Sequence, residues 1–158
     1  GDVVAFNRVS LFIRGIGGFG GERGPASISP TLSQGEREPD AVHRQRTTDN
    51  QALLYRLSSG DRNPLHADPA FAAAGGFERP ILHGLCTFGF AGRAVLRAFA
   101  GNDPARFQSI GARFTRHVFP GETLITEMWA VADDRIVFQT KVAERDEVVL
   151  SNGVVTLI

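Results

Sequence analysis

The sequence predicts an α+β fold, in which one long helix precedes a meander of antiparallel strands. The helix is predicted over residues 84–99, where apolar residues recur at helical spacing: Leu85, Phe88, Val95, Leu96 and Phe99. Residues 106–158 are predicted to be strands, because Ile136, Phe138, Thr140 and Val142 alternate there with Arg135, Val137, Gln139 and Lys141. Asp133-Asp134 predicts a tight turn, Pro120-Gly121 precedes a strand over Thr123–Val131, and a last strand follows over Val148–Ile158.

The composition is that of an ordinary globular domain. The chain has 158 residues, of which 42% are hydrophobic and 22% charged, so one domain is expected and disorder of the whole is excluded. Seventeen basic residues balance seventeen acidic ones, and the pI is about 7.1. Because binding to nucleic-acid phosphates usually needs a basic excess, a nucleic-acid partner is not expected. The one cysteine, Cys86, allows no internal disulfide and fits a reducing compartment. No apolar run reaches about 18 residues, so no membrane-spanning helix is expected.

The first forty residues differ from the rest of the chain. Residues 3–14 alternate loosely between apolar and polar and predict a strand, and the first four residues resemble neither a signal peptide nor a natural start. Residues 15–40 contain seven glycines and three prolines, the composition of a connector. Gly15–Gly20 matches the dinucleotide-binding GxGxxG pattern, but Gly21–Pro25 cannot form the helix that would bind the pyrophosphate. We therefore interpret 15–40 as a crossover between a strand over 1–14 and a domain over 41–158.

Residues 41–101 are predicted to be mostly helical, with start and stop signals. Asp49 is a candidate N-cap for a helix over Gln51–Leu57 that ends at Ser58-Ser59-Gly60. Asp68-Pro69 begins a short helix that Gly75-Gly76 ends.

The long helix contains three glycines: Gly84, Gly89 and Gly92. Each costs about 1 kcal/mol relative to alanine. This cost indicates that another backbone approaches the helix closely, as in a curved sheet that wraps around it.

The segment Gly60–His66 carries the strongest chemical signal. Within six residues it contains a carboxylate, a carboxamide and an imidazole: Asp61, Asn63 and His66. A carboxylate and an imidazole at close range supply a base and an acid that can share one water molecule. Taken alone, the same segment also fits an ordinary turn with an idle histidine beside a helix start.

The segment Pro80–Leu85 is the second candidate. Gly84 begins the long helix, so its backbone N–H is unpaired and lies at the positive end of the helix dipole. Such a group can stabilise a developing oxyanion. An ordinary helix start, with Gly84 placed for packing, is the alternative.

Weaker candidates are interpreted as structural. His83 and His66 lack the spacing and the third ligand of a metal site, so no metal is predicted. Cys86 is expected to be a buried, small apolar residue. Three basic residues lie on a predicted strand: His43, Arg44 and Arg46. This strand is expected to be a solvated sheet edge rather than a nucleic-acid patch.

The segment Tyr55–His66, followed by Ala72, resembles the hydratase 2 motif of the (R)-specific enoyl-CoA hydratases of the MaoC-like family. Further matching segments are Gly76-Phe77, Pro80–Phe90, Arg113-Phe114, Pro120–Leu124, Glu127–Trp129 and Val149–Val154. Over residues 41–158 the chain looks most similar to the hydratase domains of peroxisomal multifunctional enzymes type 2 and to their bacterial MaoC-like relatives. One departure is Ser58-Ser59, where the family usually has one residue. The extra residue either lengthens the preceding helix or displaces Asp61.

The resemblance implies a hot-dog fold, an antiparallel sheet wrapped around the 84–99 helix. It also implies that residues 41–158 are the second repeat of a double hot dog, and that residues 1–14 are the last strand of the first repeat. The expected partner is therefore that first repeat or a second copy of the chain in a homodimer.

The resemblance also implies a hydro-lyase that hydrates trans-2-enoyl-CoA to (R)-3-hydroxyacyl-CoA in fatty-acid metabolism. Asp61 and His66 would hold the water and exchange protons, Asn63 would orient the water or the loop, and the Gly84 amide would polarise the thioester carbonyl. The other substrate contacts implied are Phe114, His83, Arg62, Pro64 and Leu65. No metal or redox cofactor is implied, because the reaction moves only water and protons. The substrate is an acyl-CoA or an acyl-carrier thioester.

Two other functions remain open: a hot-dog acyl-CoA thioesterase and a non-catalytic acyl-binding partner subunit. Residues 84–100 contain no Asp or Glu, which a thioesterase would place near its central helix. The Asp61, Asn63 and His66 set, which non-catalytic subunits often lose, is intact. The expected location is the cytoplasm for a bacterial source and the peroxisome for a eukaryotic one, although Val155–Ile158 carries no peroxisomal tripeptide.

Overall fold

The computed structural model describes residues 2–11, 13, 15, 17–21 and 37–158. In these ranges five strands form one antiparallel sheet in the order β1-β3-β4-β5-β2. The strands are β1 Ala41–Arg46, β2 Phe107–Phe114, β3 Thr123–Ala132, β4 Arg135–Val142 and β5 Glu147–Leu157. The helices are α1 Gln51–Ser59, α2 Pro69–Ala74 and α3 Gly84–Phe99, with short 3-10 turns η1 Pro64–His66 and η2 Pro104–Arg106.

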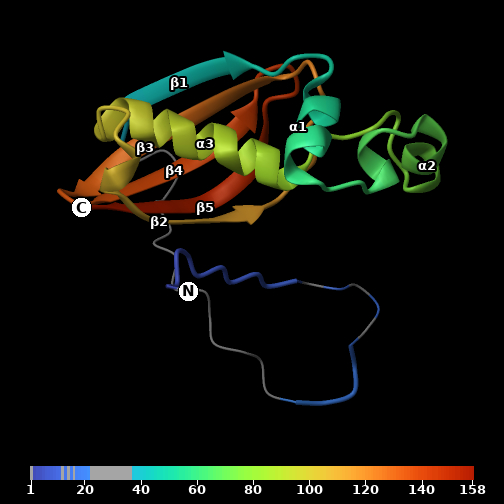
Figure 1. Cartoon of the computed structure of the whole chain (residues 1–158), viewed down its shortest axis with the longest axis horizontal. Helices are drawn as coiled ribbons and strands as arrows, with labels where there is room; N and C mark the ends of the chain where they lie inside the picture. The colour runs from blue at the N-terminus through green and yellow to red at the C-terminus, as the bar shows by residue number, and fades with distance from the viewer. Residues whose placement is uncertain (1, 12, 14, 16, 22–36) are drawn as a thin grey trace.

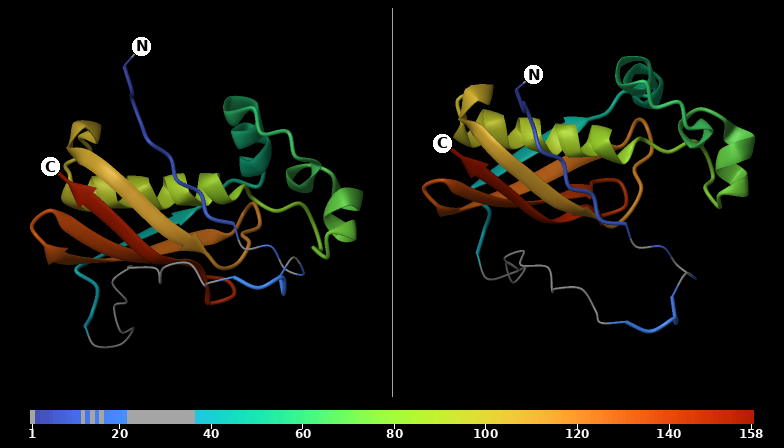
Figure 2. Two further views of the ribbon diagram at one scale, coloured as in Figure 1. Left: turned by 90° about the horizontal axis from the view of Figure 1, so that it is seen from below. Right: turned by 60° about the horizontal axis from the view of Figure 1, so that its bottom comes forward.

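The long helix α3 lies lengthwise against one face of the sheet, and α1 and α2 lie near its N-terminal end (Figure 1). Two further views show the same arrangement from other sides (Figure 2). The predicted α+β class is confirmed, and the central helix on an antiparallel sheet is the expected hot-dog fold.

The helix packs on the sheet through small side chains. Ala91 and Ala94 are at most 1% exposed. They belong to a core cluster that also contains Val95, Met128, Ile136, Phe138, Leu150 and Val155. Burial of each large apolar side chain stabilises the fold by about 1.5–3 kcal/mol. This packing holds α3 in place and so fixes the position of Gly84 at its start.

The predicted meander is confirmed. β4 occupies Arg135–Val142, and a turn at Asp133-Asp134 joins it to β3, where Ala132 pairs with Arg135. The predicted inward set of Ile136, Phe138, Thr140 and Val142 is buried, and Val137 of the opposite set is buried as well. Local alternation therefore predicted the strand and its inward face, but not the burial of Val137 on the other face.

The glycines of α3 make room for side chains rather than for a backbone. A Cβ atom on Gly84 would lie 3.1 Å from Phe114 Cε1, and one on Gly92 would lie 3.4 Å from Ile110 Cδ1. Gly89 has no such neighbour in the described part of the chain. The expected close approach to the helix is found at Gly84 and Gly92. The expected backbone partner is wrong, because side chains of β2 project toward the helix and meet it before the strand backbone does.

The strand predicted over 3–14 is not formed against this sheet, and its place as the last strand of a first repeat stays a prediction. Residues 2–11 have no regular secondary structure, and their apolar side chains are exposed, Val4 by 97%. An alternating segment becomes a strand only where a neighbouring strand supplies hydrogen-bond partners, and none of β1–β5 pairs with it. Residues 12 and 14, and residues 16 and 22–36 of the predicted crossover, lie outside the described residues.

Helix α1 begins at Gln51 as predicted, but its N-cap is Asn50 rather than Asp49. The Asp49 carboxylate instead accepts a hydrogen bond from Arg46 Nη2 at 2.8 Å. Asp49 lies one residue before the N-cap, so the predicted cap is wrong although the predicted start is confirmed.

Cys86 is buried as predicted, with 5% exposure, and burial raises the pKa of its thiol to about 11. None of the helices in the described ranges combines the length and the apolar character that crossing a membrane requires.

Candidate active site

The end of α1 sets the start of the Gly60–His66 loop. Gly60 ends the helix with a left-handed φ of 74°, a conformation that glycine adopts readily. The hydroxyls of Ser58 and Ser59 donate to the Tyr55 carbonyl at 3.1 and 2.7 Å, and the Asp61 N–H donates to Ser59 Oγ at 3.2 Å. Both serines therefore lie in the last turn of α1, and Ser59 ties the helix end to Asp61.

Two side chains brace the loop that follows. Asp61 Oδ1 accepts the Asn63 N–H at 3.1 Å, and Asn63 Oδ1 accepts the Leu65 N–H at 3.0 Å. Pro64 occupies the first position of η1, where its fixed φ suits a helix start. Of the two tasks expected of Asn63, orientation of the loop is the one that these hydrogen bonds perform.

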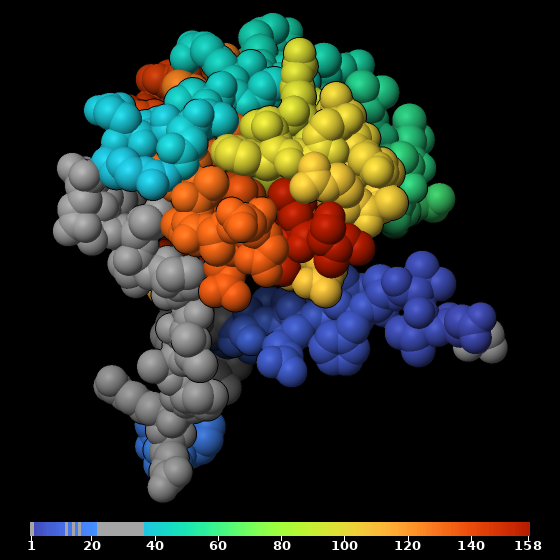
Figure 3. All heavy atoms as spheres, turned by 90° about the vertical axis from the view of Figure 1, so that its left-hand side faces the viewer, coloured from blue at the N-terminus to red at the C-terminus, as the bar shows by residue number. Residues whose placement is uncertain are grey.

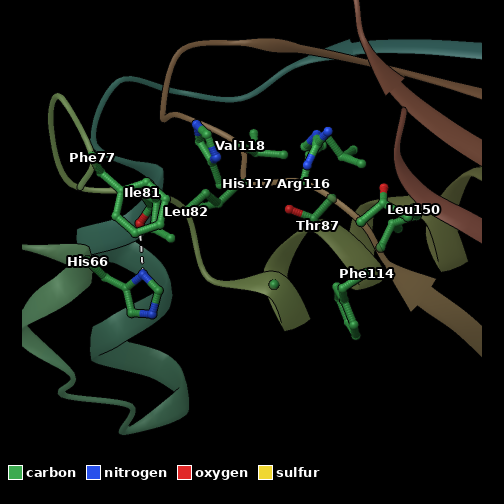
Figure 4. Close-up of a pocket in the computed structure, with 13 residues that line it drawn as sticks. His66, Phe77, Ile81, Leu82, Thr87, Phe114, Arg116, His117, Val118 and Leu150 are labelled. Atoms are coloured by element: carbon green, nitrogen blue, oxygen red, sulfur yellow. Dashed lines mark hydrogen bonds between the residues drawn. The ribbon is translucent and has the colours of Figure 1, made fainter. Parts of the chain in front are cut away.

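His66 is the next member of the site, with 8% exposure. Its Nδ1 lies 2.8 Å from the Ile81 carbonyl oxygen (Figure 4). Because a carbonyl only accepts, Nδ1 carries the proton, and Nε2 of the neutral ring keeps a free lone pair. The Ile81 carbonyl thus sets the tautomer that a general base needs.

His83 lies behind His66. The two rings are stacked, with centroids 3.7 Å apart, and Tyr55 packs against His83 with a centroid distance of 4.8 Å. His83 Nε2 lies 3.5 Å from the backbone carbonyl oxygen of Asp61, while Nδ1 is buried without a partner in the described residues. Burial lowers the pKa of His83, and the charge of His66 lowers it further.

The ligand atoms of Asp61, His66 and His83 lie within 4.8 Å of one another. Asp61 is thus the third potential ligand that the sequence pattern lacked. A zinc ion needs lone pairs that converge at about 2.0–2.2 Å. The lone pairs of two stacked rings lie in their own planes and run side by side, and His66 Nδ1 is already bonded to Ile81. The set fits proton transfer better than metal binding.

A pocket of about 430 Å³ opens beside His66, between the start of α3, the end of β2 and β5 (Figure 4). It is lined by His66, Phe77, Ile81, Leu82, Gly84, Thr87, Phe114, Thr115, Arg116, His117, Val118, Val149 and Leu150. Most of these side chains are apolar, with His66 and the Gly84 backbone among the polar exceptions. This composition suits an acyl chain next to a reacting polar group.

The structure brings three of the predicted site residues into this pocket: His66, Gly84 and Phe114. The other predicted substrate contacts do not line it. His83 is only 2% exposed, Arg62 offers its carbonyl to Arg56 Nη1, and Pro64 and Leu65 form the η1 turn. These residues build the wall and the loop behind the pocket.

Four polar lining residues were missed from the sequence: Thr87, Thr115, Arg116 and His117. Thr87 follows Gly84 by three residues, so helical spacing could have placed both on one face. No local pattern marks His117, which packs edge-on against Phe77 and Phe119.

An ion pair clamps the loop that carries His117. Arg145 Nε and Nη2 donate to the two Glu122 carboxylate oxygens at 2.6 and 3.0 Å, and Nη2 also donates to the His117 carbonyl at 2.8 Å. Glu122 Oε2 accepts the Phe119 N–H at 2.7 Å. The adjoining Val118 carbonyl accepts the Leu82 N–H at 2.7 Å, so the clamp reaches the segment that leads into Gly84.

The sequence matches the family model of the MaoC like domain over residues 31–152. It is 55% identical to the probable enoyl-CoA hydratase 2 of Dictyostelium discoideum over 148 residues, 94% of this chain and 50% of that protein. It is 54% identical to the peroxisomal multifunctional enzyme type 2 of Mus musculus over 157 residues, 99% of this chain and 21% of that protein. A solved MaoC-like dehydratase from Phytophthora capsici superposes with a TM-score of 0.83 at 42% identity, over 92% of this chain and 50% of that one.

The chain thus spans half or less of the length of these three relatives. The match covers the Gly60–His66 loop, the Pro80–Leu85 segment and the whole of α3. It confirms the resemblance predicted from the motifs: this chain belongs to the MaoC-like domain family.

Proposed function

We propose that this chain is the catalytic unit of a hydro-lyase that adds water reversibly to trans-2-enoyl-CoA and forms (R)-3-hydroxyacyl-CoA in fatty-acid metabolism. The observation that carries the proposal is the state of His66: one ring nitrogen is fixed on Ile81, and the ring stands at the pocket beside Asp61. The name of the D. discoideum relative supports the same reaction.

Hydration requires a base to take a proton from water and an acid to deliver a proton to C2 of the acyl chain. His66 Nε2 and the Asp61 carboxylate are the two groups available for these steps. The two roles are assigned to the pair and not divided between its members. Asn63 acts through the loop, since its Oδ1 holds the Leu65 N–H.

Addition of water to an enoyl thioester builds negative charge on the thioester oxygen. The Gly84 N–H stands at the first position of α3 and has no acceptor in the described part of the chain. The helix dipole adds favourable potential at this end. The Thr87 hydroxyl lines the same pocket one turn further along and is a second donor for this oxygen.

A second hot-dog unit is proposed to complete the substrate site, either another repeat of a longer chain or a second copy. β2 is an edge strand of the sheet. Near it, Phe114 is 49% exposed and Leu85, which follows Gly84, is 62% exposed. Exposed apolar side chains next to a pocket mark an interface, and the D. discoideum relative is about twice as long as this chain.

We propose no metal or redox cofactor, since the reaction transfers only water and protons; the acyl-CoA or acyl-carrier thioester is the substrate. The proposed location remains the cytoplasm for a bacterial source and the peroxisome for a eukaryotic one.

The test is an assay of crotonyl-CoA and a longer enoyl-CoA, with the oligomeric state measured in the same buffer. Loss of the enoyl-thioester absorbance without release of free CoA, and with the (R)-3-hydroxy product, supports the proposal. Release of free CoA would favour a thioesterase. Binding of the acyl-CoA with neither reaction, in a preparation that contains the second unit, would favour a non-catalytic acyl-binding subunit.

A further inference from the structure

A second hollow, of about 410 Å³, lies between β1 and the C-terminal half of α3. Its lining residues, here called the basic groove, are His43, Arg44, Gln45, Arg93, Arg97 and Asn102. None of them lines the pocket at His66. Arg97 is thirteen residues after Gly84, about 20 Å along the helix. Figure 3 views the face on which β1 and α3 lie side by side.

The basic groove concentrates positive charge. Arg93, Arg97 and His43 line it together with two carboxamides, and no carboxylate lines it. Arg44 alternates along β1 with His43 and Gln45, which face α3, so its side chain lies on the other face of the sheet, where its charge acts on Glu144. None of the ion pairs in the described ranges includes Arg93 or Arg97. In a chain with no formal net charge, this local excess attracts an anion.

One lining side chain, that of Arg93, is held in place, and so is the backbone at Asn102. The Arg93 guanidinium donates to Gln45 Oε1 and stacks on Phe90, with Cζ 5.0 Å from the ring centroid. Asn102 takes a left-handed φ of 62°, and its N–H donates to the Leu96 carbonyl at 3.1 Å. Less side-chain entropy is lost on binding when the donors are already positioned.

We propose that the basic groove binds a phosphate-bearing small molecule. A guanidinium matches two phosphate oxygens at once, and arginine is the residue best suited to such recognition. The carboxamides of Gln45 and Asn102 add neutral donors beside the arginines. The expectation of a merely solvated edge at β1 took no account of α3, which contributes Arg93 and Arg97 to the same hollow.

Calorimetric titration of the 158-residue chain with inorganic pyrophosphate tests the proposal. Arg93→Gln/Arg97→Gln, which removes two exposed arginines of α3, should weaken pyrophosphate binding by at least about tenfold, and the unfolding midpoint should stay unchanged. Arg135→Gln, which removes one charge from an arginine of β4 outside the groove, should bind as the parent does. Equal binding by the parent and the double variant, or no binding to the parent at millimolar concentration, would overturn it.

The source of the phosphate is a separate question, and one of its answers rests on the proposed function. If the double variant raises KM for crotonyl-CoA but not for crotonyl-pantetheine, the groove holds the phosphates of the substrate's own CoA. If it loses pyrophosphate binding while both KM values stay the same, the ligand is a separate phosphate compound. The calorimetry remains informative even if the chain shows no hydration, so failure of the proposed function and failure of the groove are distinct results.

Discussion

The imidazole rings of His66 and His83 are stacked, with centroids 3.7 Å apart and planes inclined by 26°. His83 is 2% exposed and is packed on Tyr55 at its other side. Its Nε2 faces the carbonyl oxygen of Asp61. One buried residue therefore contacts both members of the proposed catalytic pair, and we regard His83 as a positioning residue that does not touch the substrate.

The buried histidine should make stability depend on pH. Burial, and then the charge of His66, lower the pKa of His83 below its ordinary 6.5. The unfolded chain takes up a proton at this residue near pH 6.5 that the folded chain does not, so stability is fully present above that pH and is lost below it. Urea titrations should show the free energy of unfolding falling from about pH 7 to about pH 5.

His83→Phe, which keeps an aromatic ring, should make this pH dependence shallower. His117→Phe should make the pH dependence shallower as well, because burial also lowers the pKa of His117 and its contribution has the same sign; the effects of the two substitutions should add. An equal slope in the parent and in His83→Phe would contradict the assignment.

Asp61→Asn and His66→Ala should each lower kcat for crotonyl-CoA hydration by about 10²–10⁴-fold. Asp61 is exposed and its carboxamide analogue can still accept the Asn63 N–H, so the fold should be retained. Asp133→Asn, in the β3–β4 turn, is the charge-matched control and should turn over as the parent does. Near-parental turnover in either catalytic variant would end the assignment.

Gly84→Ala should lower kcat/KM by about tenfold with little loss of stability. The new Cβ would lie 3.1 Å from Phe114 Cε1, and the half-exposed Phe114 can turn away, but only by changing the wall of the pocket. Gly89→Ala on the same helix meets no atom within 4 Å and should stabilise the chain by about 0.5–1 kcal/mol with kcat/KM retained. Steady-state kinetics and thermal unfolding of the two variants check this contrast.

Arg145→Met should destabilise the chain by about 2–3 kcal/mol, because it leaves the Glu122 carboxylate, 8% exposed, without its cation. The loop through His117 also loses the hydrogen bond from Arg145 Nη2. Because His117 lines the pocket, KM for crotonyl-CoA should rise. Arg46→Met breaks an exposed pair with Asp49 and should cost less than about 1 kcal/mol. Similar free energies of unfolding for the two variants would show that burial of the Glu122 pair contributes nothing.

Several features were predictable from the sequence because their causes are local. Helix α3 and strand β4 follow from the spacing of side chains a few residues apart. Asp61, Asn63 and His66 were found together because one short loop contains them. The place of the additional serine could not be resolved in this way, since only the hydrogen bonds of Ser58 and Ser59 to Tyr55 show that both lie in the last turn of α1.

The sequence by itself determined the α+β class, the central helix and the loop with its carboxylate and imidazole. The tertiary structure alone decided that His83 stands behind His66, that Arg145 holds Glu122 from 23 residues away, and that β1 and α3 share the basic groove. It also decided that residues 2–11, despite their alternating pattern, pair with no strand of the sheet. The physical reason is range: periodicity and capping act between neighbours in the chain, whereas stacking, ion pairing and strand pairing depend on which distant segments the fold brings into contact.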